Sequence, residues 1–317
     1  MTEILFFIGK GGVGKSTTSA VSALRLAAGG RKTCLVSMDP AHNLSDIFET
    51  RFSETPCRVT PHLRVSEIDA ERWSAKYLKE TREQIRKTYL YETAFGLEGH
   101  FKVLQYSPGI EEYALLTAFE HVLKQVDDAD VLIVDMAPTA VALRFFSLPF
   151  TTLAWVDQLL KLRELICRKK EIISRIQVGN MTSERDRIKA KLQSLVIRYT
   201  RLRDLFCTDT VQIQLVMNPD RLSLAEARRI HARLADFGIR VARIIVNKVT
   251  SDAPLNGIAR EFSQLPIARM PAAPSDLIGL PALQAYISRH PTAFTDARVP
   301  ATATGTSARA DCRHHTG

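Results

Sequence analysis

The stretch from Gly9 to Thr17 constrains the fold of this chain more than any other segment. It reads Gly-Lys-Gly-Gly-Val-Gly-Lys-Ser-Thr and contains the P-loop pattern, in which a glycine and four further residues precede Gly-Lys-Ser. The apolar run at 4–8 is typical of a buried parallel strand. Apolar residues at helical spacing follow the loop until Gly29 and Gly30 end the pattern. Strand, glycine loop and helix together predict an α/β domain that binds phosphates.

The chemistry of this loop follows from its backbone. Glycines let successive N–H groups point inward toward phosphate oxygens, and the helix N-terminus adds partial positive charge. We expect Lys15 to reach the β- and γ-phosphates and the Ser16 hydroxyl to bind Mg²⁺, with ATP as the nucleotide. The predicted nucleotide-binding residues are Gly11, Gly12, Val13, Gly14, Lys15, Ser16 and Thr17.

A second lysine, Lys10, lies inside the loop. It has two interpretations, a solvated loop lysine or a functional one. The run from Lys10 to Thr17 resembles the deviant Walker A motif of the SIMIBI nucleotidases. In that group the early lysine crosses a dimer interface to the partner's nucleotide. The resemblance therefore implies a homodimer with nucleotide near its interface.

Length and composition bound the remaining choices. The 317 residues allow one large or two modest domains. No run approaches 18 uncharged apolar residues, and the N-terminus enters the first strand at once, so we expect a cytoplasmic protein without a membrane span or signal peptide. Five scattered cysteines argue against a disulfide framework. A net charge of +9 permits an anionic membrane surface, nucleic acid or an acidic partner without selecting one.

Two further strands end in carboxylates. The strand predicted at 33–37 leads into Asp39, which is a candidate for orienting the attacking water; capping the turn before Pro40 is an equal alternative. The apolar run at 131–134 ends in Asp135, which resembles a Walker B carboxylate able to hold Mg²⁺. We expect the loop that follows, 136–139, to sense the γ-phosphate.

The βα alternation is interrupted once. Apolar residues at helical spacing predict two amphipathic helices in 151–207, with a break at Gly179-Asn180. The segment 151–210 holds 13 Lys and Arg against 7 Asp and Glu residues. Strands are predicted again at 210–216, 241–246 and 265–271, and an exposed helix at 70–91. The predicted fold is a doubly wound, mostly parallel α/β sheet. Its domains are an ATPase domain at 1–150 and 208–290, a helical insertion at 151–207 and a disordered tail at 291–317.

Several motifs converge on one family. They occupy 39–46, 108–112, 135–139 with 143–149, 219–224 and 246–248. Together they resemble the arsenite-pump ATPase (ArsA) family, which includes the tail-anchored-protein targeting factors. The resemblance implies that Lys10 acts in trans and Asp39 positions the hydrolytic water. It also implies that Asp135 is the Walker B carboxylate, that Asn247 contacts adenine, and that dimer closure with ATP moves the insertion.

The chain departs from the family pattern in four respects. Ala140-Val141 stands where the family usually has Gly-His after Pro-Thr, so coupling through this loop differs. The stretch 251–257 lacks the C-x-x-C that binds zinc in the eukaryotic targeting factors, and this argues against a zinc-clasped dimer. The length excludes the duplicated two-domain pump. The insertion is short, which argues against a large client groove.

Three uses of the ATPase remain open. The first is targeting of a membrane-protein client, with the insertion stripes forming an apolar groove; simple packing of those helices is an equal alternative. The basic rim would then face lipid headgroups or an acidic receptor. The second is energising an arsenite permease, where Cys167 and Cys207 could meet in a helical hairpin; buried core residues are the simpler interpretation. The third, positioning on DNA or a membrane, is disfavoured by the 39–46 motif. His42 and His121 are interpreted as structural.

Overall fold

The computed structural model describes residues 2–88, 109–177, 187–250 and 255–291. These residues divide into two compact units. The first, here called the sheet unit, comprises Met1–Asp69, Val122–Leu143 and Asp209–Gly317. The second, the helical unit, comprises Ala70–His121 and Arg144–Thr208. Residues 292–317, where the sequence predicted a disordered tail, lie outside the described residues, as does the predicted break at Gly179-Asn180.

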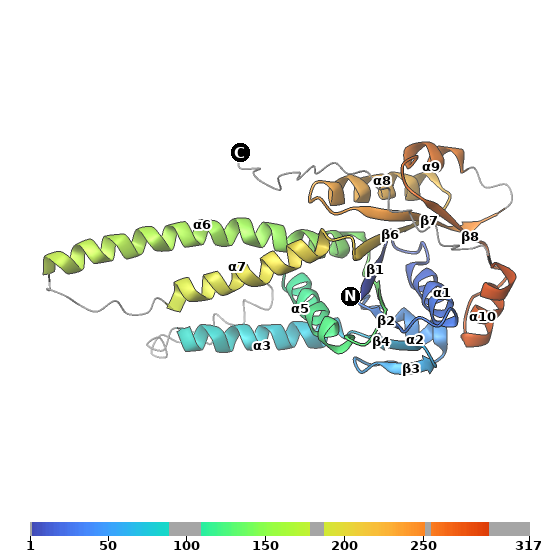
Figure 1. The fold of residues 1–317 in the computed structure, drawn as a ribbon, viewed down its shortest axis with the longest axis horizontal. Coiled ribbons are helices and arrows are strands. Elements are labelled where there is room, and N and C mark those ends of the chain that lie inside the picture. Colours follow the sequence, from blue (N-terminus) through green and yellow to red (C-terminus); the bar gives the residue numbers. More distant parts are fainter. Residues whose placement is uncertain (1, 89–108, 178–186, 251–254, 292–317) are drawn as a thin grey trace. The chain divides into compact units, whose positions relative to one another are not determined.

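The sheet unit is built on one eight-stranded sheet (Figure 1). Its strands are β1 (Glu3–Ile8), β2 (Thr33–Ser37), β3 (Cys57–Thr60), β4 (Leu63–Glu67), β5 (Val131–Asp135), β6 (Val211–Met217), β7 (Val241–Val249) and β8 (Ile267–Pro271). Their order is β3-β4-β2-β5-β1-β6-β7-β8, and every neighbouring pair is parallel except the edge pair β3 and β4. This confirms the predicted doubly wound, mostly parallel α/β fold.

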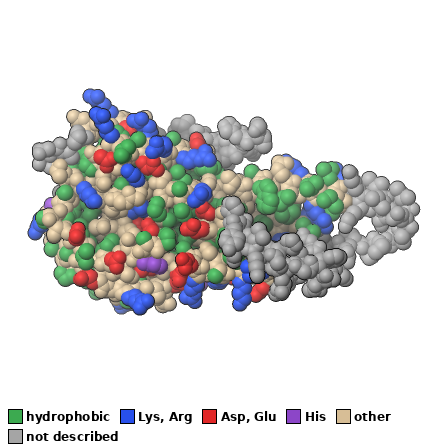
Figure 2. Space-filling model, turned by 180° about the vertical axis from the view of Figure 1, so that it is seen from behind, with side chains coloured by type: hydrophobic (Ala, Val, Ile, Leu, Met, Phe, Trp, Pro, Cys, Tyr) green, Lys and Arg blue, Asp and Glu red, His purple; other side chains and the backbone are tan. Residues whose placement is uncertain are grey.

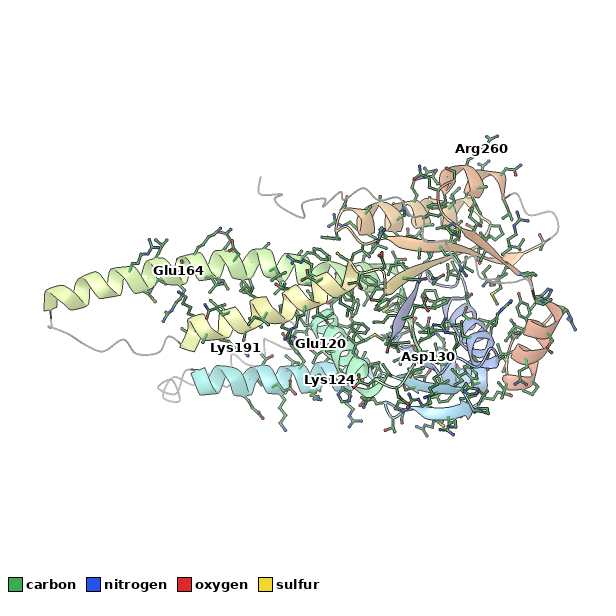
Figure 3. All side chains as sticks on the ribbon, in the orientation of Figure 1. Glu120, Lys124, Asp130, Glu164, Lys191 and Arg260 are labelled. Atoms are coloured by element: carbon green, nitrogen blue, oxygen red, sulfur yellow. The ribbon has the colours of Figure 1, made fainter. Side chains whose placement is uncertain are left out.

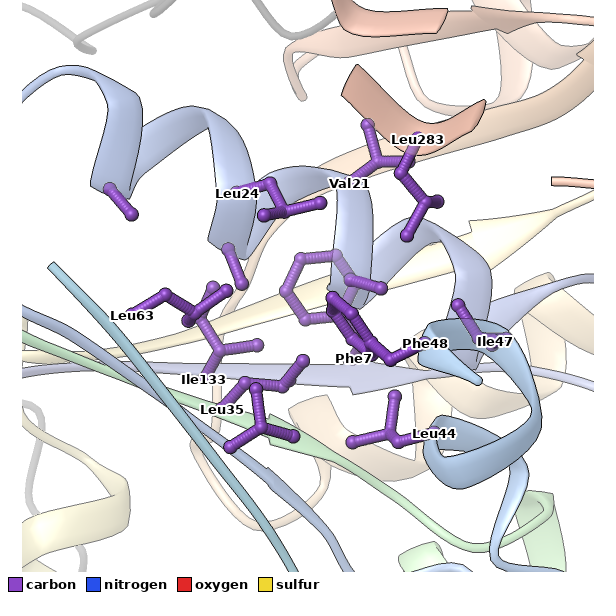
Figure 4. Packing of buried hydrophobic residues seen from close by; sticks show 14 of the residues in the cluster. Phe7, Val21, Leu24, Leu35, Leu44, Ile47, Phe48, Leu63, Ile133 and Leu283 are labelled. Carbon is purple, nitrogen blue, oxygen red and sulfur yellow. The ribbon is translucent and has the colours of Figure 1, made fainter. Parts of the chain in front are cut away.

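Helices cover the sheet because both faces of its central strands are apolar. In β1, Phe6 and Phe7 point to opposite faces and both are buried. The helices of this unit are α1 (Lys15–Ala28), α2 (Asn43–Phe48), α8 (Arg221–Ala235), α9 (Asn256–Glu261) and α10 (Leu280–Arg289). Figure 4 shows how α1, α2 and α10 share one core with alternate strand residues, including Phe7, Leu35 and Ile133.

The described residues of the helical unit form four helices. They are α3 (Ala70–Thr88), α5 (Ile110–Gln125), α6 (Thr139–Gln177) and α7 (Arg187–Phe206), with the first residues of α6 and the last of α5 belonging to the sheet unit. Figure 3 shows Glu164 on the side of α6 that faces α7, where Lys189 pairs with it at 3.3 Å. Three phenylalanines of α6 and α7, Phe145, Phe146 and Phe206, pack edge to face or tilted against one another.

The predicted boundaries of the helical insertion, 151–207, do not coincide with this unit. α6 begins at Thr139 and continues through Pro149, and the unit also takes in Ala70–His121. In addition, Thr139–Arg168 is long and apolar enough to cross a membrane by length and composition, whereas the sequence analysis expected no such helix. This is weak evidence for a membrane span, because the core helix of a globular protein passes the same test.

Candidate active site

The P-loop joins β1 to α1 and has the geometry that only glycine permits at two positions. Gly14 caps α1 with φ of 85°, and a Cβ there would lie 2.3 Å from the Asn247 side chain. A Cβ on Gly9 would lie 2.2 Å from the carbonyl oxygen of Val216 on β6. Lys15 and Ser16 open α1 and are buried. The loop is therefore clamped between the ends of β1, β6 and β7.

Asn247, near the end of β7, holds the P-loop through its side chain. Its side-chain amide donates to the carbonyl of Val13 at 2.8 Å, and its own side-chain oxygen accepts from the N–H of Lys248 at 2.8 Å. The side chain is buried. The adenine contact implied for Asn247 stays a prediction. The bond to Val13 is a role the sequence analysis missed, because the two residues lie more than 200 positions apart.

Two carboxylates and a serine lie at the carboxyl ends of β2 and β5, where open α/β sheets place ligands. Ser37 and Asp135 are directly paired across these strands. The Asp39 N–H donates to the Ser37 hydroxyl at 3.2 Å, and the Asp39 carboxylate accepts from the Ala41 N–H at 3.1 Å. Ser37 was not singled out from the sequence. A polar residue ending a buried strand just before Asp39 was the available signal.

Asp135 is fully buried. Neither carboxylate oxygen has a hydrogen-bond partner of good geometry among the described residues, although the hydroxyls of Ser16 and Ser37 lie near enough to favour its charged form. Loss of solvation raises the pKa of Asp135 to about 7, and the nearby charge of Asp39 adds to the rise, while Ser16 and Lys15 oppose it. The site thus gathers Lys15, Ser16, Ser37 and Asp39 around the buried carboxylate of Asp135.

The residues present fit a divalent cation. A hard cation such as Mg²⁺ prefers oxygen ligands, and the unpartnered oxygens of Asp135 beside the Ser16 hydroxyl supply them. The side-chain amide of Asn43, the first residue of α2, donates to the Ser16 hydroxyl at 3.5 Å. The hydroxyl of Thr139, which follows Asp135 by four residues and begins α6, is also buried without a partner among the described residues.

Lys10 differs from Lys15 in being exposed. Asp220 caps the N-terminus of α8, where the Ser223 N–H and hydroxyl donate to its carboxylate at 2.8 and 2.7 Å. These bonds, chiefly the backbone one, lower the pKa of Asp220, and the charge of Lys10 contributes. Lys10 therefore lies near the start of α8 of the same chain.

The other candidates lie elsewhere. His42 belongs to the loop after Asp39, with φ of 51° and Nδ1 3.6 Å from the carboxylate of Glu67. His121 lies in the helical unit, its ring tilted against Trp73 at 5.3 Å.

Cys167 and Cys207 do not meet. Cys167 lies on α6 three residues after Glu164, which pairs with Lys189 near the start of α7. Cys207 directly follows the last residue of α7. The length of α7 therefore separates the two cysteines by roughly 25–30 Å, at about 1.5 Å per residue.

A glycine loop capping a helix, a buried lysine and serine, and two carboxylates at the edge of a parallel sheet define a P-loop nucleotide hydrolase. The comparisons with known proteins make this specific. The model of the anion-transporting ATPase family, the ArsA ATPases, matches residues 2–257. The chain therefore belongs to the ArsA ATPase family and is an ATP hydrolase.

Relatives carry two kinds of name. The putative arsenical pump-driving ATPase 1 of Aquifex aeolicus is 30% identical over 313 residues, covering 89% of this chain and 77% of that protein. The ATPase get3 of Schizosaccharomyces japonicus is 30% identical over 307 residues, covering 89% and 90%. The ATPase GET3A of Arabidopsis thaliana is 28% identical over 315 residues, covering 91% and 85%. Similarity alone thus does not choose between pump and targeting roles.

Proposed function

We propose that this ATPase works as a homodimer that couples Mg·ATP hydrolysis to the handling of a hydrophobic helix from a membrane protein. The observation that carries the proposal is an apolar surface on the helical unit. Trp155, Leu162 and Leu165 of α6 are 62%, 53% and 54% exposed, and Ile197 of α7 is 58% exposed. Figure 2 shows hydrophobic side chains at the surface of these helices.

The spacing of the α6 residues places them on one side of that helix. Trp155, Leu162 and Ile166 recur every seven or four residues, so they lie along one side of α6. Large apolar side chains gathered on one exposed face mark a binding surface more often than scattered single ones do. The excess of basic residues in this part of the sequence suits lipid headgroups or an acidic receptor, and a cytoplasmic protein bound peripherally to a membrane.

Hydrolysis would rest on positioning and charge neutralisation. The loop N–H groups and Lys15 bind the phosphates, and Ser16 and Asp135 hold Mg²⁺. When bound, Mg²⁺ neutralises charge on the phosphate oxygens. Asp39 orients the attacking water in line with the γ-phosphate. Lys10 stabilises developing charge on the nucleotide of the neighbouring protomer.

The role of an arsenical pump subunit is the second candidate, because relatives of similar identity carry that name. A soft metalloid needs about three thiolates at one place. The separation of Cys167 and Cys207 speaks against a site within one chain. Among the described residues there is no group of three His, Cys, Asp or Glu side chains placed to hold a metal ion.

The two roles are separated by one pair of assays. We expect the purified protein, with ATP, to retain a 20-residue apolar helix supplied by a membrane-protein tail. Replacing Trp155 and Leu162 by serine should abolish retention while leaving basal ATPase activity unchanged. Replacing Leu222, an exposed apolar residue of α8, is the matched control. Stimulation of the ATPase by arsenite or antimonite, without retention of any apolar helix, would instead support the pump role.

A further inference from the structure

Glu67, the last residue of β4, is a buried carboxylate that the mechanism above does not use. Only 3% of its surface is exposed. One carboxylate oxygen accepts from the Ser45 N–H at 3.0 Å and the other from the Ser45 hydroxyl at 2.6 Å. His42 Nδ1 lies 3.6 Å from that second oxygen. Both partners belong to the segment that begins with Asp39.

We propose that Glu67 is a positioning residue for ATP hydrolysis, which fixes the segment 39–46 so that Asp39 faces the attacking water. The inference rests on the role proposed for Asp39. It assigns Glu67 no contact with the nucleotide, the metal ion or the water. Its effect passes through the backbone between His42 and Asp39.

That backbone is tightly connected. The His42 N–H donates to the Asp39 carbonyl at 3.2 Å, and the Ala41 N–H donates to the Asp39 carboxylate at 3.1 Å. His42 itself has φ of 51°, a left-handed conformation that is unfavourable for a residue with a Cβ. Such a turn persists only where its surroundings hold it. Glu67 stabilises the end of the turn that is farther from Asp39, through its contacts with His42 and Ser45.

Glu67 can do this because its own position is fixed. It is paired with Ser37 across β4 and β2, and Ser37 in turn accepts from the Asp39 N–H. The Glu67 N–H donates to the Ser53 carbonyl at 2.9 Å. Leu44 and Phe48 of α2 anchor the other side of the segment in the core of Figure 4. Asp39 thus follows the end of β2 by two residues, and Glu67 ends the adjacent strand β4.

A purely structural role for Glu67 predicts something different. A carboxylate near the N-terminus of α2 would stabilise that helix, and its loss would lower the melting temperature without changing turnover per folded molecule. Positioning predicts the opposite pattern, with kcat falling while nucleotide affinity is kept. Displacements of about 1 Å at a reacting group can cost as much as 100-fold in rate.

Glu67→Gln is the first test, because glutamine keeps the size but turns one acceptor oxygen into a donor facing Ser45. We expect kcat to fall about tenfold or more. The dissociation constant for a fluorescent ATP analogue should change less than about threefold. Amide exchange at Ser45 and Phe52, whose N–H donates to the Ser45 hydroxyl, should accelerate. Glu3→Gln, which alters a carboxylate bonded to Arg31 and Gln212, is the matched control and should keep kcat.

Ser45→Ala breaks the same link from the other side and serves if Glu67→Gln fails to fold. It should reproduce the loss of kcat, Ser45→Thr should recover part of it, and the double variant should be no worse than either single one. Unchanged kcat in both variants, or nucleotide affinity lost in proportion, overturns the proposal. If Asp39→Asn retains turnover, the role of Asp39 fails as well; if only Asp39→Asn is inactive, the failure belongs to Glu67 alone.

Discussion

Asp135 is the residue whose surroundings most clearly require a ligand. Its carboxylate has been removed from water, and both oxygens lack a hydrogen-bond partner of good geometry among the described residues. A buried charge without a partner is unfavourable, so burial favours the neutral carboxyl and raises the pKa of Asp135 to about 7. A bound cation would reverse the preference. A cation bound at this carboxylate would therefore favour its charged form and lower its pKa.

Replacing Asp135 by asparagine should stabilise the protein in the absence of Mg²⁺ and nucleotide. Because the folded pKa of about 7 lies above the ordinary aspartate value of 3.8, the folded state binds more protons than the unfolded state between these limits. Wild-type stability therefore falls as pH rises through this window, and the variant lacks that loss. From about pH 5.5 to pH 8 the stability gap should widen by roughly 2 kcal/mol in denaturant titrations.

The same variant should lose Mg²⁺-dependent hydrolysis. Addition of Mg·ATP should stabilise the wild type much more than Asp135→Asn, closing the gap at high pH. A stability gap that is independent of pH, or a variant that still hydrolyses ATP with Mg²⁺, would contradict the assignment of this carboxylate.

Asn247→Ala should weaken nucleotide binding through the loop rather than through the base. The substitution removes the donor to Val13 and leaves that buried carbonyl without its partner, a change worth roughly 1–3 kcal/mol. We expect the dissociation constant for ATP to rise about tenfold or more, and that for inorganic triphosphate to rise in parallel. An effect on ATP alone would assign Asn247 to adenine recognition, as the family resemblance implies.

At the scale of elements, Arg198 joins α7 to α5 through polar contacts. It forms a forked ion pair with Glu120 and also donates to the Thr117 hydroxyl at 3.0 Å. Figure 3 labels Glu120 on α5. The neighbouring Tyr199 is buried, and loss of solvation raises its pKa above the ordinary range. This cluster fixes where α7 packs within the helical unit.

Arg198→Ala should therefore destabilise the helical unit, by roughly 1–3 kcal/mol, because it leaves a partly buried carboxylate without its partner. Arg198→Lys should recover only part of the loss, since lysine lacks the planar fork. Arg233→Ala, which breaks an exposed pair with Asp236, should change the melting temperature little. Equal melting temperatures for the Arg198 and Arg233 variants would remove this role.

The elements also separate what the sequence could predict from what it could not. β2 and β5 lie at their predicted residues, because a short apolar run ending in a polar residue is a local signal. The start of α6 at Thr139 was missed, since Pro149 usually ends a helix and here lies inside one. The pairing of Ser37 with Glu67, and the bond from Asn247 to Val13, depend on the register of distant strands, which no local pattern encodes.

At the scale of the whole molecule, the assembly of two protomers is open to a direct test. Lys10→Ala and Asp39→Asn should each inactivate the ATPase. If Lys10 serves the partner's nucleotide, a heterodimer of the two variants keeps one intact site, composed of Asp39 from one chain and Lys10 from the other. After random subunit exchange between equal amounts of the two variants, about half of the dimers are heterodimers, and each has one intact site of two. The mixture should therefore regain about a quarter of wild-type activity.

The measurement is ATPase rate after mixing and subunit exchange, with each variant alone as its control. If Lys10 acts on the nucleotide of its own chain, no mixture regains activity. A chain that sediments as a monomer with ATP, with ADP and without nucleotide would exclude the dimer altogether.

α6 joins Thr139, at the catalytic edge, to the exposed stripe of Trp155 and Leu162 without interruption. Each residue of a helix turns the chain by about 100° around the helix axis. Two residues inserted into α6 between Thr139 and Trp155 would therefore turn the stripe by roughly 200° around that axis, whereas an insertion of whole turns would leave its rotation unchanged. If α6 couples hydrolysis to client binding, the two-residue insertion should keep ATPase activity and lose the coupling.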